Sequence, residues 1–303
     1  MDTSIMDRFE TSIDCTSSNI PMNTYELITN KIIEKMKTGQ VPWRKPWKFQ
    51  PPRNLVSKRS YHGINLLLLT LNEYESPYYV TFHQAKQLGG SIKKGEHGTP
   101  IVFWKLLKTL NNDSVKEEEK TKVIPYLQYS TVFNLCQTEG IESPNDAPST
   151  LAPLAVCEEI IAGFIDKPQT IHTLLPKAYY QPEADMIHMP SKTSFVSSEA
   201  YYSTLFHEYV HATGHEKRLN RHAQENTNFD FGSKDYSREE LVAELGSAFL
   251  CAEAQIDNSV IDNNTAYLNS WLKALQDDKK LIIFASAKAG KAVDYIRNRR
   301  EGN

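Results

Sequence analysis

The sequence lacks the features that would place a protein in a membrane or hold it together through sulfur. No stretch approaches the roughly 20 consecutive apolar residues that a membrane-spanning helix needs. The four cysteines lie far apart and form no C-x-x-C pair, which argues against a thiolate zinc site and a dense disulfide scaffold. We therefore expect a cytoplasmic protein with reduced thiols and no membrane partner. The cysteines are Cys15, Cys136, Cys157 and Cys251.

The first residues also lack an apolar segment. A secretory signal peptide carries a run of about 7–15 apolar residues. The stretch MDTSIMDRFETSIDCTSSNI is instead polar and acidic. We expect residues 1–24 to form a flexible leader.

Neither sign of charge is in large excess over the whole chain, whose formal net charge is −3. That balance hides an asymmetry, because residues 25–108 hold 14 basic and 5 acidic residues. This segment carries +9, so the remainder carries −12. A chain of 303 residues has room for two ordinary domains. A basic block beside an acidic one suggests a polyanion-binding module joined to something else.

Hydrophobic periodicity and turn residues predict an α+β protein with two domains. In the first domain, the stretch 63–74 fits either a buried helix or a strand. The other expected elements there are a helix at 24–39, a short helix at 81–90, a turn and strand at 91–108, an exposed loop at 111–122 and a partner strand at 129–140. An interdomain linker is expected at 143–153. The second domain is expected to be mainly helical, with helices at 155–165, around 207, at 237–254 and from 267 to 300, and a strand-like segment at 178–190.

A histidine pair stands in a helix-like run of the second half. The segment SSEAYYSTLF leads into HEYVH without Gly or Pro, and Ser197 or Ser198 can cap its start. Residues four apart lie on one helical face, so His207 and His211 can share a metal ion. Glu208 follows one step around the helix. This is the H-E-x-x-H pattern, in which two imidazoles hold Zn²⁺ and the glutamate takes a proton from water.

Two histidines leave such a site short of a protein ligand, since a catalytic zinc usually has three. His215 is the nearest further histidine, but it follows the pair by only four residues. The metzincin spacing H-E-x-x-H-x-x-G-x-x-H keeps Gly214 but needs a histidine where Lys217 stands. We therefore place His215 at the helix end or against substrate rather than on the metal.

Carboxylates farther along are better third ligands. The stretch EELVAE puts Glu240 and Glu244 one helical turn apart on one face, and it resembles the E-x-x-A-D element of gluzincin-type peptidases. The resemblance implies that Glu240 binds the metal and that Glu244 accepts a hydrogen bond from a ligand imidazole. Two alternatives stay open: Glu244 is the ligand, or Glu240 only caps its own helix in a box with Ser237. Glu239 is expected to be solvated.

Aromatic and basic residues interleave in the first half, most closely in PWRKPWK. This mixture suits single-stranded DNA, because cations follow the phosphates and rings stack on exposed bases, worth about 1–3 kcal/mol per base. The alternative is that the tryptophans fill a core while the cations are solvated. The residues expected to bind DNA are Trp43, Arg44, Lys45, Trp47, Lys48, Arg59, Tyr61, Lys93 and Lys94.

Longer motifs in both halves resemble the ArdC-type antirestriction proteins. In the first half they are VPWRKPWK, SYHGINLLLL, TFHQAKQLGGSIKKGEHGTPIVFWK and VFNLCQTEG; in the second they are YYSTLFHEYVHATGHEKRLNR and EELVAELGSAFLCAE. The resemblance implies an α+β single-stranded-DNA-binding domain at 25–142. It also implies a zincin-like, gluzincin-type metallopeptidase domain at 154–303.

The resemblance further implies a protein of a mobile element that protects incoming DNA from restriction. The expected cofactor is Zn²⁺, with another divalent metal such as Mn²⁺ as the alternative. The expected partners are single-stranded DNA and a protein substrate that is a DNA-bound or restriction protein. Two other functions fit the same residues. One is a DNA-associated zinc metalloprotease without an antirestriction role, and the other is a DNA-binding scaffold with a non-catalytic zincin fold.

Overall fold

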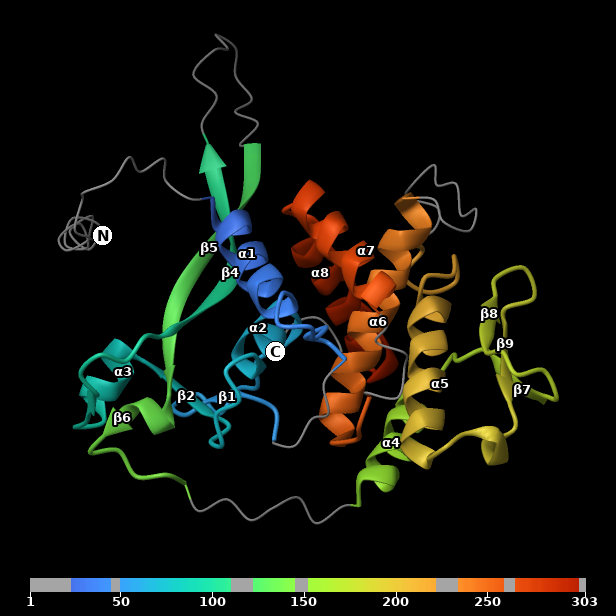
Figure 1. Cartoon of the computed structure of the whole chain (residues 1–303), viewed down its shortest axis with the longest axis horizontal. Coiled ribbons are helices and arrows are strands. Elements are labelled where there is room, and N and C mark those ends of the chain that lie inside the picture. Colours follow the sequence, from blue (N-terminus) through green and yellow to red (C-terminus); the bar gives the residue numbers. More distant parts are fainter. Residues whose placement is uncertain are drawn as a thin grey trace, which may run out of the picture.

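The computed structural model describes residues 23–44, 50–109, 122–144, 152–221, 234–258 and 265–299 (Figure 1). They form an α+β structure of two domains. Within these residues no helix is long and apolar enough to cross a membrane. The expected leader and the expected charged loop lie almost wholly outside the described residues.

The amino-terminal domain is built on a four-stranded sheet in the order β1-β2-β5-β4. The long strands β4 (Thr99–Thr109) and β5 (Lys122–Asn134) pair antiparallel along the whole length of β4, from Thr99 opposite Val132 to Thr109 opposite Lys122. The predicted pairing of a strand within 91–108 with one at 129–140 is therefore confirmed, and β5 begins earlier than expected. The other strands of this domain are β1 (Arg53–Asn54), β2 (Tyr78–Thr81), β3 (Ser91–Ile92) and β6 (Thr138–Glu139).

Local capping chemistry fixes where the helices of this domain begin. Asn23 caps α1 (Thr24–Met36) by accepting a hydrogen bond from the Tyr25 amide at 3.1 Å. Thr81 and Gln84 form a capping box at the start of α3 (Phe82–Gln87). The stretch left open between helix and strand forms α2 (Gly63–Thr70), in which most side chains are buried. A 3₁₀ turn, η1 (Leu135–Gln137), joins β5 to β6.

The carboxy-terminal domain is mainly helical and carries a three-stranded sheet in the order β7-β9-β8. The strand-like segment expected at 178–190 is a hairpin, because Asp185 turns the chain with φ at +48°. Its second strand, β9, is the central strand of this sheet. The strands are β7 (Gln169–Thr173), β8 (Tyr179–Gln181) and β9 (Met186–Pro190), followed by a 3₁₀ turn, η2 (Lys192–Ser194). The helices are α4 (Pro153–Gly163), α5 (Ser198–Thr213), α6 (Lys234–Ala254), α7 (Thr265–Asp277) and α8 (Leu281–Ile296).

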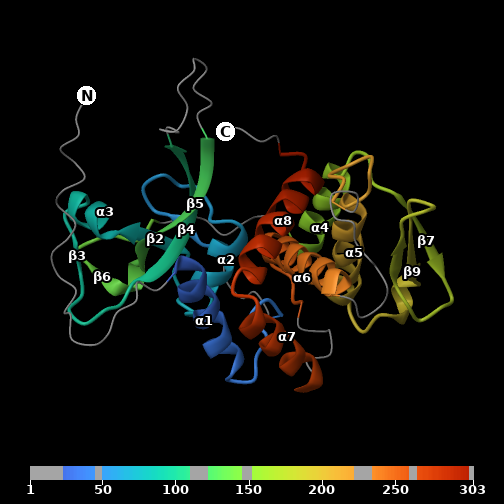
Figure 2. The same ribbon diagram turned by 90° about the horizontal axis from the view of Figure 1, so that it is seen from above.

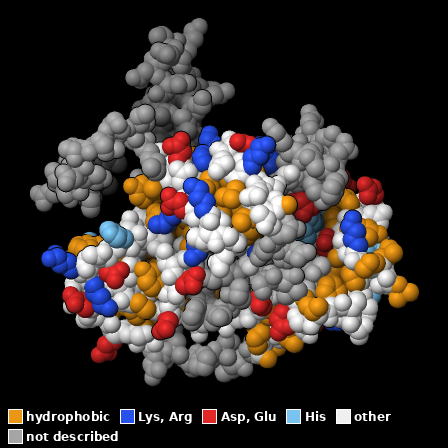
Figure 3. Space-filling view, in the orientation of Figure 1, with side chains coloured by type: hydrophobic (Ala, Val, Ile, Leu, Met, Phe, Trp, Pro, Cys, Tyr) orange, Lys and Arg blue, Asp and Glu red, His pale blue; other side chains and the backbone are white. Residues whose placement is uncertain are grey.

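The two domains share one hydrophobic core. Apolar side chains of α1 and α2 belong to the same buried cluster as those of α5, α6 and α8. In Figure 2, α1 lies beside α7, and α2 lies between the long hairpin and α8. On the face shown in Figure 3, hydrophobic, basic and acidic side chains are interspersed over both domains. Because the core is continuous, residues of the basic half lie close to α5, the helix that carries the HEYVH motif.

Candidate metal centre

The HEYVH motif occupies the carboxy-terminal half of α5. Ser197 caps this helix by accepting a hydrogen bond from the Ala200 amide at 3.1 Å, which decides between the two expected caps. The Nε2 atoms of His207 and His211 face each other at 3.1 Å. Glu208 is buried, with 6% of its surface exposed. The helical spacing therefore brings the two imidazoles together as expected.

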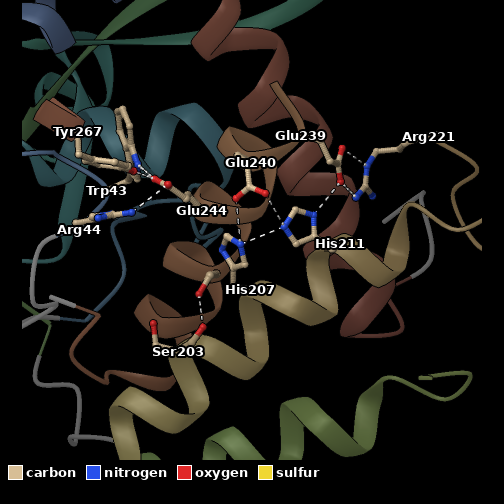
Figure 4. A network of polar contacts seen from close by, with 11 residues as sticks. Trp43, Arg44, Ser203, His207, His211, Arg221, Glu239, Glu240, Glu244 and Tyr267 are labelled. Carbon is tan, nitrogen blue, oxygen red and sulfur yellow. Dashed lines mark hydrogen bonds and ion pairs between the residues drawn. The ribbon is translucent and has the colours of Figure 1, made fainter. Parts of the chain in front are cut away.

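Glu240 reaches the histidine pair from α6, which lies alongside α5 (Figure 4). Its carboxylate oxygens lie 3.5 Å from His207 Nε2 and 3.6 Å from His211 Nε2. Because α6 begins at Lys234, Ser237 lies inside the helix and does not form a capping box with Glu240. Of the three carboxylates in this stretch, Glu240 is the one that faces both histidines.

The three donor groups have the spacing of a tetrahedral zinc site. Their ligand atoms all lie within 4.8 Å of one another. Bonds of roughly 2.0–2.1 Å at tetrahedral angles put neighbouring donors about 3.3 Å apart. The two Nε2 atoms lie 3.1 Å apart, close to that value, and each faces its own oxygen of Glu240, at 3.5 Å for His207 and 3.6 Å for His211. Two imidazoles and one carboxylate are also a donor set that zinc commonly accepts in catalytic sites.

Glu239 lies behind His211 rather than in solvent, which corrects the expectation for this residue. Its Oε1 lies 3.6 Å from His211 Nδ1, and its side chain is 12% exposed. Arg221 donates to the same oxygen at 2.7 Å and anchors itself on Thr213 Oγ1 at 2.6 Å and on the Val210 carbonyl at 2.7 Å. Glu239 thus lies where it can hold the imidazole of His211 in place, the role that the resemblance to gluzincins implied for Glu244.

The charges around His211 shift two pKa values in opposite directions. Burial alone would lower the pKa of His211, but the carboxylates of Glu239, Glu240 and Glu208 outweigh burial and raise it. Burial would raise the pKa of Glu239, but His211 and Arg221 outweigh burial and lower it. Apart from Arg221, the charged groups around His211 are therefore carboxylates. A negative charge of this kind favours a bound cation.

Glu244 points toward the amino-terminal domain. Its carboxylate accepts hydrogen bonds from Trp43 Nε1 at 2.8 Å, from Arg44 at 3.0 Å and from the Tyr267 hydroxyl (Figure 4). The Arg44 guanidinium also lies over the Tyr267 ring, 3.8 Å from its centroid. Among the described residues, Glu244 does not contact a histidine of the motif as expected, because its oxygens hold Trp43, Arg44 and Tyr267 instead.

The side chains of Trp43 and Arg44 are consequently not accessible to DNA in this structure. Trp43 is 1% exposed and packs edge-on against Trp271. Arg44 is buried with its carboxylate partner. The alternative interpretation, in which the tryptophans of PWRKPWK fill a core, holds for Trp43. Lys45, Trp47 and Lys48 lie outside the described residues.

Comparisons with known proteins cover both domains. Residues 22–133 match the model of the N-terminal domain of anti-restriction factor ArdC, and residues 158–288 match that of a zincin-like metallopeptidase. The antirestriction protein ArdC of plasmid R388 is 36% identical over 92% of this chain and 98% of its own. Its metal-free structure superposes with a TM-score of 0.75 and its Mn(II)-bound structure with 0.72. The chain belongs to the ArdC family.

Curated relatives of this ArdC-family protein differ in length. Protein y4eC of Sinorhizobium fredii (strain NBRC 101917 / NGR234) is 30% identical over 91% of this chain and 92% of its own. Two DNA primases TraC of Escherichia coli are 34% and 32% identical over 90% of this chain. The chain spans only 27% and 20% of their respective lengths.

The remaining residues expected to bind DNA are spread out in this ArdC-family protein. Arg59 is exposed, while Tyr61 is half-buried and packs edge-on against Tyr79. Lys93 and Lys94 are exposed just after β3. In Figure 2, β3 lies at the end of the domain remote from α5. Lys93 donates to the Cys136 carbonyl at 2.9 Å. The structure does not gather these side chains into one surface.

Residues that sequence reasoning missed lie near the metal centre. Arg221 follows the motif in a stretch with no regular pattern, so nothing in the sequence ties it to Glu239. Tyr267 begins a helix-like run far from Glu244 in sequence. The one available signal was the Glu-Glu doublet, since a second carboxylate beside a metal ligand commonly braces an imidazole.

Proposed function

We propose that this protein is an antirestriction protein of a mobile element that binds single-stranded DNA and carries a metal-dependent peptidase site. The observation that carries the proposal is the convergence of His207, His211 and Glu240 at spacings that suit a tetrahedral ion. Glu208 completes the H-E-x-x-H pattern beside them. We place its action in the cytoplasm, where incoming DNA meets restriction enzymes.

His207, His211 and Glu240 would hold the ion, with Glu239 fixing the orientation of the His211 ring. The donor set favours Zn²⁺, and Mn²⁺ is the alternative, supported by the Mn(II)-bound structure of the R388 protein. A divalent ion held there would polarise a peptide carbonyl and lower the pKa of water. The proton transfers would be carried out by a side chain of the protein.

Glu208 is the residue that we assign to proton transfer. As general base its carboxylate takes a proton from the attacking water, and as general acid it returns that proton to the departing amine. Because Glu208 is buried, little bulk water surrounds its carboxylate. Exchange for glutamine keeps the shape but removes the base, so any hydrolysis should fall by about 10²–10⁴-fold.

The proposed DNA binding rests on the +9 charge of residues 25–108 and on membership of the ArdC family. Neutralising phosphates releases counterions, so the logarithm of the affinity should fall with the logarithm of salt by about 0.7 per contacted phosphate. The proposed protein substrate is a DNA-bound or restriction protein, which DNA binding would bring near the peptidase site.

The test compares wild type with Glu208→Gln in a proteolysis assay and in a DNA-protection assay. Loss of proteolysis with protection intact would show that the two activities are separable. Loss of both would tie protection to hydrolysis. Metal content serves as the control, since Glu208→Gln should keep its ion. Equal hydrolysis of a substrate by both proteins would refute the assigned role of Glu208.

A second function is a DNA-binding scaffold whose zincin domain does not catalyse. The observation that favours it is structural: Glu244, one turn from Glu240, is used to hold the amino-terminal domain. In that case Glu208→Gln would protect DNA as well as wild type, neither protein would hydrolyse a substrate, and removal of the metal would lower stability.

A further inference from the structure

Exposed aromatic rings from both domains meet on one surface. Trp104 on β4 and Phe284 on α8 are 43% and 46% exposed, and their ring centroids lie 6.1 Å apart at an interplanar angle of 34°. Tyr25 on α1 stacks against Phe284 at 6.1 Å and 26°. Single exposed rings are common on proteins, but two exposed rings that meet across the two domains, with the half-buried Tyr25 behind them, form a patch suited to binding a partner.

A cavity lies next to this row of rings. It has a volume of about 380 Å³ and lies between the beginnings of α6 and α8, with Phe284 on its wall. Sites for small organic groups measure roughly 300–1,000 Å³. The cavity therefore has room for a planar ligand group that lies beyond the row of rings.

Basic side chains surround the rings and the cavity. Lys280 is exposed and lies 5.5 Å from the centroid of the Tyr25 ring. Lys288 stands one turn after Phe284 on α8 and lines the cavity. This surface thus combines rings with cations in the manner of a single-strand binding groove.

The carboxylates of the cavity each have a cationic partner. Asp278 lies 3.7 Å from Arg238, and Glu239 accepts from Arg221 at 2.7 Å. The cavity lining holds three basic side chains, Arg238, Lys280 and Lys288, against two carboxylates, Glu239 and Asp278, so its formal charge is positive. Anionic ligands are favoured over cationic ones by that balance.

We propose that Trp104, Phe284 and the adjoining cavity form the groove in which single-stranded DNA lies, with Lys280 and Lys288 contacting phosphates. This inference rests on the proposed DNA binding and assigns it to a surface that both domains build. Bases must be unstacked to reach the rings, so the groove accepts single strands rather than duplexes.

The proposed groove lies apart from the residues of PWRKPWK that were expected to bind DNA. The rings and cations predicted in PWRKPWK include Trp43 and Arg44, which Glu244 holds in the interior. Glu239, by contrast, lines the groove's cavity and lies against His211. A strand in the groove would therefore run directly behind the metal centre.

The experiment measures binding of a fluorescent oligothymidine to the full-length protein by anisotropy at two salt concentrations. Phe284→Ala and Trp104→Ala should each weaken binding by about 10-fold or more, the loss of one stacked base. Exchange of Lys280 and Lys288 for glutamine removes two phosphate contacts. The slope of the logarithm of affinity against the logarithm of salt concentration should therefore become shallower by about 1.4. A duplex of the same length should bind more weakly than the single strand.

The matched control is Phe82→Ala, which removes a ring that is 63% exposed on α3, away from the groove. It should bind as wild type does. Because Phe284 and Trp104 are exposed, their alanine variants should unfold at the temperature of wild type. The inference is overturned if wild type binds and both groove variants bind equally well, in which case the proposed DNA binding survives on another surface. If wild type itself does not bind, the proposed DNA binding and the groove both fail.

Discussion

Glu239 and Glu240 are neighbours in the chain, yet they contact the same imidazole on different atoms. Glu240 faces His211 Nε2 at 3.6 Å, and Glu239 faces Nδ1 at 3.6 Å. One carboxylate is placed to share an ion with the ring, and the other to fix how the ring is turned. The two can be separated by exchanging them one at a time.

We predict that Glu239→Gln keeps metal binding but weakens it by about 10–100-fold, because the ring of His211 loses its charged acceptor. Competition with a chromogenic chelator measures the affinity. Thr213→Ala is the milder comparison, since it removes only one of the anchors of Arg221 and leaves the carboxylate in place. Unchanged affinity in Glu239→Gln would show that the contact is incidental.

The sequence could predict the histidine pair and its acid because their spacing alone places them on one helical face. It could not decide among the carboxylates. The pattern EELVAE shows which residues share a face of α6, but not how that helix is rotated against α5. Glu244 shares the face of Glu240 and still reaches Trp43, a residue about 200 positions away in the chain.

At the scale of elements, the site depends on how closely α5 and α6 approach. Gly246 on α6 lies against Val210 on α5, and a Cβ added there would stand 2.6 Å from Val210 Cγ2. The branched valine side chain has little freedom to move away. The absence of a side chain at this position lets Glu240 come within reach of both histidines.

Gly246→Ala should therefore push the two helices apart. We predict a loss of about 1–3 kcal/mol in unfolding free energy from overpacking, together with weaker metal binding. Urea denaturation and chelator competition measure the two effects. Gly290→Ala on α8 is the matched control, because no atom lies within 4 Å of the added Cβ. That variant should be as stable as wild type or more so, by up to about 1 kcal/mol. Equal behaviour of the two variants would argue against a tight helix contact.

The elements themselves were largely predictable, because caps and apolar periodicity are local. The helix at Thr24–Met36, the capped helix at Phe82–Gln87 and the long hairpin all follow from such signals. The stretch at Gly63–Thr70 was ambiguous because a short apolar run fits both a helix and a strand. Its burial against α8 is a long-range contact that no local pattern encodes.

At the scale of the whole molecule, Glu244 ties the amino-terminal domain to the helix that carries Glu240. Trp43, Arg44 and Tyr267 all donate to its carboxylate, and Asn258 donates to the Trp43 carbonyl at 2.8 Å. The two domains are therefore joined by a buried polar contact as well as by a common core. The sequence suggested two domains joined by a linker and gave no sign of this contact.

Glu244→Ala removes the carboxylate partner of a buried arginine, and we predict a loss of about 3–5 kcal/mol in unfolding free energy. Urea denaturation followed by tryptophan fluorescence is the measurement. Glu73→Ala is the control, since Glu73 pairs with Lys35 at 3.3 Å on the surface. Such exposed pairs contribute about 0–1 kcal/mol. A loss in Glu244→Ala no larger than in the control would show that the domains do not depend on this contact.

The central claim is that His207, His211 and Glu240 hold one divalent ion. Metal content of the purified full-length protein, measured by inductively coupled plasma mass spectrometry after loading with Zn²⁺ and desalting, tests it most directly. We predict one ion per chain in wild type and in Glu208→Gln, and almost none in His207→Ala combined with His211→Ala. Glu240→Gln should lose the ion more readily than Glu244→Gln. Undiminished metal in the double histidine variant would contradict the account, and loss from Glu244→Gln alone would reverse the two carboxylates.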